Sequence, residues 1–201
     1  MKIYDITQEI FGCVVFGADP APAKQTLCDM AKGDLYNLTA FSMCAHNGTH
    51  LDAPAHFLQD GQTVEQIPLT HTVGPAYLAE HDGPLTAEDA EAVLAAAAEA
   101  DPEAARRLLF RGRTVITLRA AEVFARAGVL LVGNESQTVG PEDAPMAVHL
   151  VLLGAGTVLL EGIRVSHVPC GVYLLNAAPI PLGGAEGAPC RAWLMEQSIK
   201  N

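Results

Sequence analysis

The chain has 201 residues, of which 50% are hydrophobic and 17% are charged, a balance typical of a globular protein rather than a disordered one. A net charge of −11 without any run of Lys or Arg disfavours nucleic acid as a partner. No segment reaches the ~18 apolar residues of a membrane span, and Asp5 and Glu9 interrupt the stretch that a signal peptide would need to be apolar. We therefore expect a cytoplasmic protein without a membrane partner, folded as a single domain over residues 1–201.

The segment AHNGTHLDAPAHF at residues 45–57 holds four potential metal ligands. All four occupy even positions, so in an extended chain they would point to one face: His46, His50, Asp52 and His56. Imidazole nitrogen with carboxylate oxygen suits Zn²⁺, with Mn²⁺ or Fe²⁺ as alternatives. Two histidines and one aspartate leave coordination positions open for water and substrate, which predicts a catalytic metal site.

Convergence of these ligands on one ion depends on turns within the segment. At ~3.3 Å per residue, a straight strand would place His46 about 20 Å from Asp52, too far to share an ion. The dipeptide Asn47-Gly48 is typical of tight turns and would fold His46 back, while Pro54 would bend the chain before the last histidine. The same glycine and proline disfavour a helix over this segment.

Residues 85–110 are rich in Ala, Glu, Leu and Arg and predict helix. Thr86 offers an N-cap oxygen with acidic residues in the first turn, and Pro102 predicts the start of a second short helix.

A β-α-β unit is predicted directly downstream. RTVIT at 113–117 predicts a strand, LRAAEVFARAG at 118–128 a helix ended by Gly128, and VLLVG at 129–133 an apolar strand. This order predicts parallel pairing of the two strands and a sheet covered by helices.

The last third of the chain continues the α/β pattern. PMAVHLVLLGAG predicts a helix that begins at Pro145 and stops at Gly154. Strands are predicted for TVLLEGI at 157–163, for GVYLLNAAPI at 171–180 and, as a closing strand, for APCRAWLM at 188–195. The whole chain therefore predicts an α/β fold.

Two polar residues stand out within these apolar runs. Glu161 ends TVLLEGI, where an unpaired carboxylate would be costly to bury, and His149 lies among aliphatic residues. Taken singly, they are a strand-end glutamate and a hydrogen-bonded core histidine. Together with a metal cluster elsewhere they become candidate ligands, either for the same ion or for a second ion that shares Asp52.

The other nucleophile candidates have weaker support. An odd number of cysteines without a C-x-x-C pair predicts free thiols. Cys44 beside the His/Asp segment has apolar neighbours at 43 and 45 and predicts a packed thiol. Ser136 lacks a G-x-S-x-G frame, so we expect it to be a substrate-loop or structural hydroxyl.

HNGTHLDAPAH at residues 46–56 resembles the signature H-x-G-T-H-x-D-A-P-x-H of the metal-dependent cyclase family, which includes the bacterial kynurenine formamidases (arylformamidases) and the isatin hydrolases. Further segments similar to that family occur in the same order: IYDITQEI, LLVGNESQTVG, LVLLGAGTVLLEG and GAPCRAWLM. The resemblance covers nearly the whole chain.

The resemblance implies a swivelling β/β/α fold and a homodimer or larger assembly. It implies metal ligation by His46, His50 and Asp52, with His149 and Glu161 completing a second metal position in two-metal members. It places His56 close by as the proton-transferring group. Formamidases of the family often place a Trp against the aryl ring in the N-terminal loop. Here that loop carries Phe11 and Phe16, and the single Trp of the chain is Trp193, so Phe16 is the predicted aromatic contact and an indole-derived substrate has less support.

Three functions are compatible with these residues. The first is hydrolysis of a small N-formyl or N-acyl aryl amine, or of a cyclic amide, by metal-activated water with His56 as general base and acid. The second keeps the ion as a Lewis acid for a cyclase or dehydratase step without net hydrolysis. The third is a non-catalytic protein that binds metal or a small ligand, which has no need of a positioned base such as His56. The metal is predicted to be Zn²⁺, with Mn²⁺ as an alternative, as one or two ions.

Overall fold

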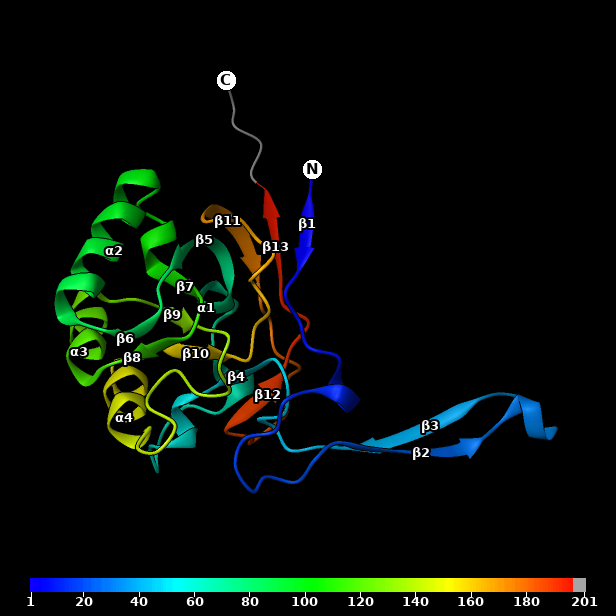
Figure 1. Ribbon diagram of the computed structural model, residues 1–201. Coiled ribbons are helices and arrows are strands. Elements are labelled where there is room, and N and C mark those ends of the chain that lie inside the picture. Colours follow the sequence, from blue (N-terminus) through cyan, green and yellow to red (C-terminus); the bar gives the residue numbers. More distant parts are fainter. Residues whose placement is uncertain (197–201) are drawn as a thin grey trace.

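The computed structural model describes residues 1–196, which form one mixed sheet of nine strands with helices on one side (Figure 1). The strand order is β1-β13-β11-β5-β7-β9-β10-β4-β12. In that order the strands span Ile3–Asp5, Trp193–Glu196, Gly171–Asn176, Val73–Glu80, Arg107–Arg111, Leu131–Gly133, Val158–Glu161, His50–Asp52 and Gly187–Pro189. Strands β5, β7, β9 and β10 run parallel, and the flanking pairs are antiparallel.

The sheet curls around one apolar core. Tyr4 of β1 and Ala188 of β12 come from opposite ends of the strand order, yet both belong to the same buried cluster. A second buried cluster fills the space between the sheet and the helices and includes Phe110 and Phe124. The α/β class predicted from the sequence, as a β/β/α arrangement, is confirmed.

Helices α2 (Ala87–Ala100), α3 (Leu118–Ala127) and α4 (Met146–Gly154) lie side by side over the outer face of the sheet (Figure 1). A further short helix, α1, spans Leu69–Thr72. The predicted ends are confirmed: Thr86 and Asp89 form a reciprocal capping box, and Gly128 follows α3 with φ +69°. Pro145 directly precedes α4, as predicted.

Two predictions around residue 110 are wrong: the extension of the helix to residue 110, and the parallel pairing of the strands at 113–117 and 129–133. Residues 107–111 form strand β7 rather than helix, and the second short helix is a single 3-10 turn at Ala104–Arg106. Leu108, Leu109 and Phe110 of β7 are fully buried in the middle of the sheet, and this burial outweighs the helix propensity of the segment. The strand at Thr114–Ile116 (β8) exists, but it pairs with β6 (Gly83–Leu85) in a separate two-stranded sheet. The parallel neighbours of β9 are β7 and β10.

The predicted closing strand at 188–195 is also wrong as a single element. It divides into β12, which pairs with β4, and β13, which pairs with β1 and β11. The two pieces therefore lie far apart in the strand order, with β12 last and β13 second. The strand predicted at 171–180 ends at Asn176, and that at 157–163 is confined to Val158–Glu161.

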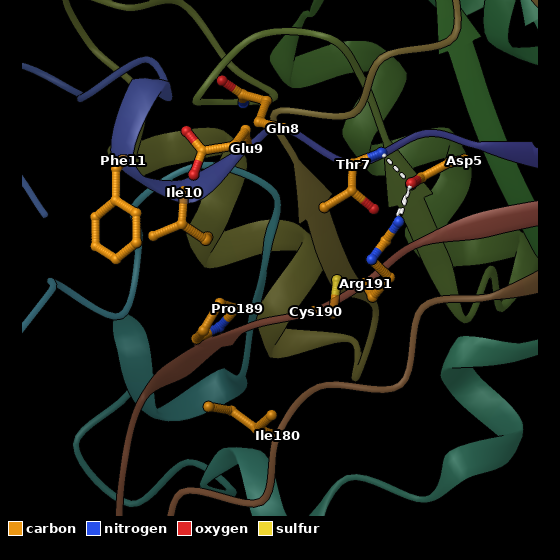
Figure 2. Close-up of a pocket in the computed structure, with 10 residues that line it drawn as sticks. All are labelled: Asp5, Thr7, Gln8, Glu9, Ile10, Phe11, Ile180, Pro189, Cys190 and Arg191. Atoms are coloured by element: carbon orange, nitrogen blue, oxygen red, sulfur yellow. Dashed lines mark hydrogen bonds and ion pairs between the residues drawn. The ribbon is translucent and has the colours of Figure 1, made fainter. Parts of the chain in front are cut away.

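A two-stranded arm projects from the body on the side away from the helices (Figure 1). It consists of β2 (Ala23–Cys28) and β3 (Leu38–Ser42), joined through a 3-10 turn at Met30–Lys32. A cavity of about 570 Å³ lies at its base, where the ring of Phe11 contacts that of Phe41. The cavity is mostly apolar and is lined from two ends of the chain (Figure 2) by Ile10, Phe11, Ile180, Pro189 and Cys190, with Asp5 and Arg191 at one side.

All five cysteines are free, as predicted. Among residues 1–196, no helix has the length and apolar composition needed to cross a membrane.

Candidate metal centre

Strand β4 supplies the centre of the site. It lies between β10 and β12, and its His50 and Asp52 are two residues apart, so both side chains leave the same face of the sheet. In the antiparallel ladder with β10, Glu161 lies directly opposite His50. All three side chains are buried, with at most 2% of each residue exposed.

The turn before β4 brings His46 back to Asp52, as predicted. The Asn47 amide donates to the Cys44 carbonyl at 3.2 Å, and Gly48 has φ +68°, a conformation that favours glycine. As a result, His46 Nδ1 lies 2.8 Å from Asp52 Oδ1.

His56 follows β4 on the 3-10 turn Pro54–His56, where the predicted bend at Pro54 is confirmed. Its Nε2 lies 4.0 Å from Asp52 Oδ2, and its ring packs against that of His46 with 4.1 Å between centroids. His56 is partly exposed, so it lies at the border between the buried cluster and the pocket.

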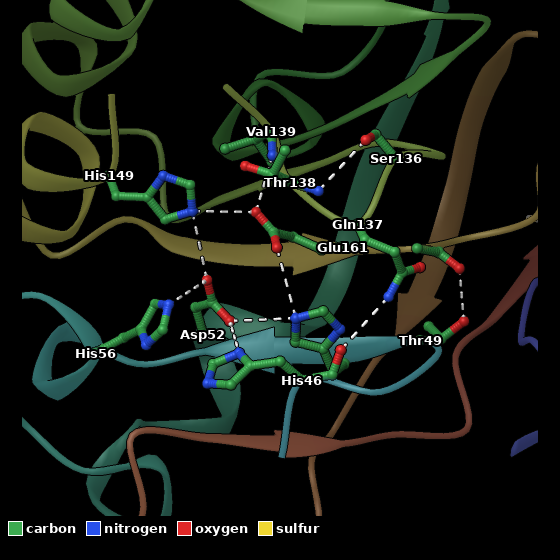
Figure 3. Close-up of polar contacts among 12 residues, drawn as sticks. His46, Thr49, Asp52, His56, Ser136, Gln137, Thr138, Val139, His149 and Glu161 are labelled. Atoms are coloured by element: carbon green, nitrogen blue, oxygen red, sulfur yellow. Dashed lines mark hydrogen bonds and ion pairs between the residues drawn. The ribbon is translucent and has the colours of Figure 1, made fainter. Parts of the chain in front are cut away.

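His149 reaches the same cluster from helix α4 (Figure 3). Its Nε2 lies 3.3 Å from Glu161 Oε1 and 3.6 Å from Asp52 Oδ2. Glu161 Oε1 also accepts a hydrogen bond from the Val139 amide at 2.8 Å, and its Oε2 lies 3.5 Å from His50 Nε2. Side chains that are far apart in sequence thus converge on Asp52.

These residues form two overlapping groups, each with ligand atoms within 4.8 Å of one another. His46, His50 and Asp52 make the first group, and Asp52, His149 and Glu161 make the second. Asp52 is common to both and turns Oδ1 toward His46 and Oδ2 toward His149.

The donor set fits a divalent cation. Within residues 1–196, His50 Nε2 and Asp52 Oδ2 are buried without any hydrogen-bond partner, although both point into the cluster. An unpaired buried polar group costs about 1–3 kcal/mol, so these two atoms are better explained by a ligand that binds them. Imidazole nitrogens and carboxylate oxygens are the donors that Zn²⁺ and similar ions take.

The electrostatics of the cluster favour positive charge. Burial lowers the pKa of His50, but the nearby carboxylates of Asp52 and Glu161 outweigh burial and raise that pKa to about 10. The pKa values of His46 and His149 are raised in the same way, against burial, by Asp52 and Glu161 respectively. His56 behaves differently, because burial dominates and lowers its pKa. Its imidazole is therefore neutral over a wider pH range.

The cluster opens into a pocket of about 410 Å³. Phe16 and Phe57 line it beside the histidines, and Asp19 and Glu186 bring two further carboxylates to it. Ser136 lies outside this pocket: it lines a neighbouring cavity of about 420 Å³, and its Oγ accepts a hydrogen bond from the Thr138 amide at 3.4 Å.

Several polar residues around the site were not identified as site residues from the sequence, although Gln8 and Gln137 lie in segments that resemble the family. The Gln137 side chain donates to the Gly48 carbonyl at 2.9 Å and accepts from the Gln8 side chain at 2.6 Å, which ties the turn before β4 to two distant loops. Glu186 Oε1 lies 3.2 Å from His46 Nε2. None of these residues belongs to a spaced motif, and only the fold brings them to the histidines.

Comparison with known proteins agrees with this architecture. A model of the family described as "Putative cyclase" matches residues 4–141. The kynurenine formamidase of Salinibacter ruber is 34% identical over 174 residues, covering 80% of each chain. That of Paracidovorax citrulli is 31% identical over 206 residues, covering 96% of this chain and 95% of the relative.

Solved structures give the same result. A structure described as a potential metal-dependent hydrolase with cyclase activity has a TM-score of 0.80 at 27% identity, covering 98% of both chains. Isatin hydrolase A of Labrenzia aggregata shares the fold, with a TM-score of 0.80 at 22% identity over 98% of this chain and 94% of the other. The chain therefore belongs to the putative cyclase family, in which its relatives include kynurenine formamidases.

Proposed function

We propose that this protein is a metal-dependent hydrolase of small amides that acts on C–N bonds other than peptide bonds. The observation that carries the proposal is the convergence of three histidines and the buried carboxylate of Glu161 on Asp52, at the base of an open pocket. The kynurenine formamidase relatives support the reaction class. A pocket of about 410 Å³ with two aromatic walls suits an N-formyl or N-acyl aryl amine, or a cyclic amide.

In the proposed site, His46, His50 and Asp52 would hold one ion, and in a protein that takes two ions His149 and Glu161 would hold the second together with Asp52. A divalent ion would supply Lewis acidity, which activates water for attack and polarises the carbonyl of the amide. We favour Zn²⁺, with Mn²⁺ as the alternative, because the donors are mainly imidazole.

His56 is the proposed general base and acid. Its ring borders the pocket, and its lowered pKa keeps Nε2 able to accept a proton from water at neutral pH and deliver it to the departing amine. Phe16 is the proposed contact for the aryl group, because it lines the same pocket. Ser136 lines the adjoining cavity, where we retain it as a substrate-loop candidate.

A second candidate reaction is a cyclase or dehydratase step without net hydrolysis. It is favoured by the description of one structural neighbour as having cyclase activity. A single experiment separates the two. Purified protein is analysed for metal content and is then incubated with N-formyl aryl amines and with lactams. The masses of the products are measured by mass spectrometry. Hydrolysis adds one water to a lactam, or releases formate from a formamide, whereas the alternative adds no water. Metal-free protein that remains fully active would overturn both.

We also propose that the protein is a homodimer or larger homo-oligomer and that the arm formed by β2 and β3 contributes to the interface. Five large arm residues are 50–93% exposed: Leu27, Met30, Leu35, Tyr36 and Phe41. At about 200 Å² per large side chain they present on the order of 600 Å², close to the ~800 Å² per partner of a stable interface. An isolated two-stranded ribbon is also only marginally stable in water, which favours an arm that packs against another subunit.

The charge of the arm supports a second copy of this chain as its binding partner. Over residues 23–42, two lysines balance two aspartates, so the arm has no net charge, whereas the whole chain carries −11. The arm is therefore a place where two copies can meet with little repulsion. Light scattering should show that the double variant Leu35→Glu, Tyr36→Glu has a lower oligomer mass than the wild type. The control variant Leu69→Glu, at a residue on α1 that is 62% exposed, should keep the wild-type mass. A monomeric wild type would overturn this proposal.

A cytoplasmic location stays a prediction. It is supported by the five free thiols, which are typical of a reducing compartment. Detection of a tagged form of the protein in the separated fractions of lysed cells would test this location.

A further inference from the structure

Two of the three clustered histidines are oriented by backbone carbonyls. His50 Nδ1 lies 3.0 Å from the Gly48 carbonyl oxygen, and His149 Nδ1 lies 2.9 Å from that of Pro145. A carbonyl oxygen can only accept, so each Nδ1 carries the hydrogen. In both residues Nε2 is then the nitrogen that is free to bind an ion, and it is Nε2 that faces the carboxylates of Asp52 and Glu161.

His46 has the opposite orientation. Its Nδ1, not its Nε2, lies against Asp52. The outer nitrogen, Nε2, lies 3.2 Å from Glu186 Oε1, and the hydrogen bonds of residues 1–196 include no backbone carbonyl on this ring. An ionised carboxylate also only accepts, so without an ion both ring nitrogens of His46 face an acceptor, Nδ1 facing Asp52 and Nε2 facing Glu186. When an ion takes the place of the hydrogen on Nδ1, the ring keeps its hydrogen on Nε2, where Glu186 accepts it.

The residue after Glu186 shapes the space for the same ring. A Cβ added at Gly187 would lie 2.8 Å from His46 Cε1 and 2.9 Å from the Leu51 carbonyl oxygen, closer than real Cβ contacts allow. Gly187 pairs with Asp52 in the ladder between β12 and β4, so its position relative to the cluster is set by the sheet. A larger residue at 187 would push the imidazole away from Asp52.

We propose that Glu186 and Gly187 are positioning residues for His46: the carboxylate of Glu186 accepts the Nε2 hydrogen and thereby presents Nδ1 to the ion, and Gly187 leaves room for the ring. Histidines that bind metals commonly donate their other ring hydrogen to a carboxylate or a carbonyl, and loss of that partner weakens metal binding by about 10- to 100-fold. The inference rests on the proposed metal-dependent function. Glu186 acts through His46, since its side chain is 45% exposed at the rim of the pocket.

The test compares Glu186→Ala and Glu186→Asp with a matched control at a glutamate that contacts the same loop. Glu65 is suitable, because its Oε1 accepts a hydrogen bond from the Gly184 amide, two residues before Glu186, and it is not among the residues that line the pocket. Zn²⁺ affinity is measured by competition with a chelator. We expect about 10- to 100-fold weaker binding in Glu186→Ala, partial recovery in Glu186→Asp, and wild-type affinity in Glu65→Ala.

A direct readout is the tautomer of His46. Long-range ¹H–¹⁵N correlation spectra of the Zn²⁺-loaded protein should show the hydrogen of His46 on Nε2 in the wild type and in Glu65→Ala, and a changed or averaged tautomer in Glu186→Ala. If Glu186 contributed only its negative charge, Glu186→Ala would weaken Zn²⁺ binding without moving this hydrogen. The difference in affinity between variant and wild type would then shrink as salt is added. Gly187→Ala should also weaken binding. If that variant does not fold, the Glu186 variants still decide.

The outcomes are distinguishable from failure of the proposed function. A wild type that binds no divalent ion overturns the metal site and this inference together. A wild type that binds Zn²⁺, combined with a Glu186→Ala variant of unchanged affinity and tautomer, overturns only the role of Glu186.

Discussion

Glu161 lies directly opposite His50 in the ladder between β10 and β4, and its Oε2 is 3.5 Å from His50 Nε2. The hydrogen bonds of two neighbouring strands therefore hold a candidate ligand from each at a fixed separation. Helix α4 and the turn before β4 then only have to add His149 and His46 around a rigid pair. This explains how a small set of residues from distant segments can form one centre on rigid elements.

Replacement of the β4 ligands should remove metal and activity together. Asp52 is common to both groups, so Asp52→Ala should lose all bound metal, whereas His50→Ala should lose at least the ion of the first group. Elemental analysis of the purified variants, with turnover of an N-formyl aryl amine, checks both. Full metal occupancy in either variant would rule out the proposed site.

Glu161→Gln keeps the size of the side chain and removes its charge. Its amide can still accept a hydrogen bond from Val139, so we expect a folded protein that has lost activity and the second ion. Circular dichroism, metal content and turnover are the measurements. Wild-type activity in this variant would make Glu161 a structural residue at the end of β10 and would remove the main support for two ions.

His56→Ala should separate metal binding from chemistry. His56 Nε2 is 4.0 Å from Asp52 Oδ2, and His56 is outside both groups of candidate ligands. We expect unchanged metal stoichiometry and turnover lowered by about 100- to 10,000-fold, the usual contribution of a positioned acid and base. Metal loss would instead identify His56 as a ligand, and unchanged turnover would assign the proton transfer to another group.

Metal binding should release protons and should strengthen as the pH rises. The pKa of His50 is raised to about 10 against burial by Asp52 and Glu161, so in the metal-free protein its imidazole is charged at neutral pH. An ion binds only the neutral imidazole, so binding must displace that proton, and apparent affinity should rise by about tenfold or more per pH unit near neutrality. Calorimetry in two buffers of different ionisation enthalpy counts the protons. Binding without proton release at pH 7 would contradict this prediction.

The features that could be predicted from the sequence are local ones. The spacing of His50 and Asp52, the Asn47-Gly48 turn and the bend at Pro54 all occur as predicted, because strand alternation and turn conformation depend on residues close together in the chain. The start of α2 at Thr86 and the end of α3 at Gly128 follow from capping, which is equally local.

The pairing of the strands and the surroundings of the site depend on contacts between distant segments and could not be predicted. Residues 107–111 have helical composition but form a central strand, because burial in the sheet is worth more than their propensity. The segment at 188–195 divides between the second and the last strand of the order, and the pattern of the segment alone does not predict this division. Glu186 meets His46 across 140 residues of sequence, and such a contact exists only once the curled sheet has brought β12 beside β4.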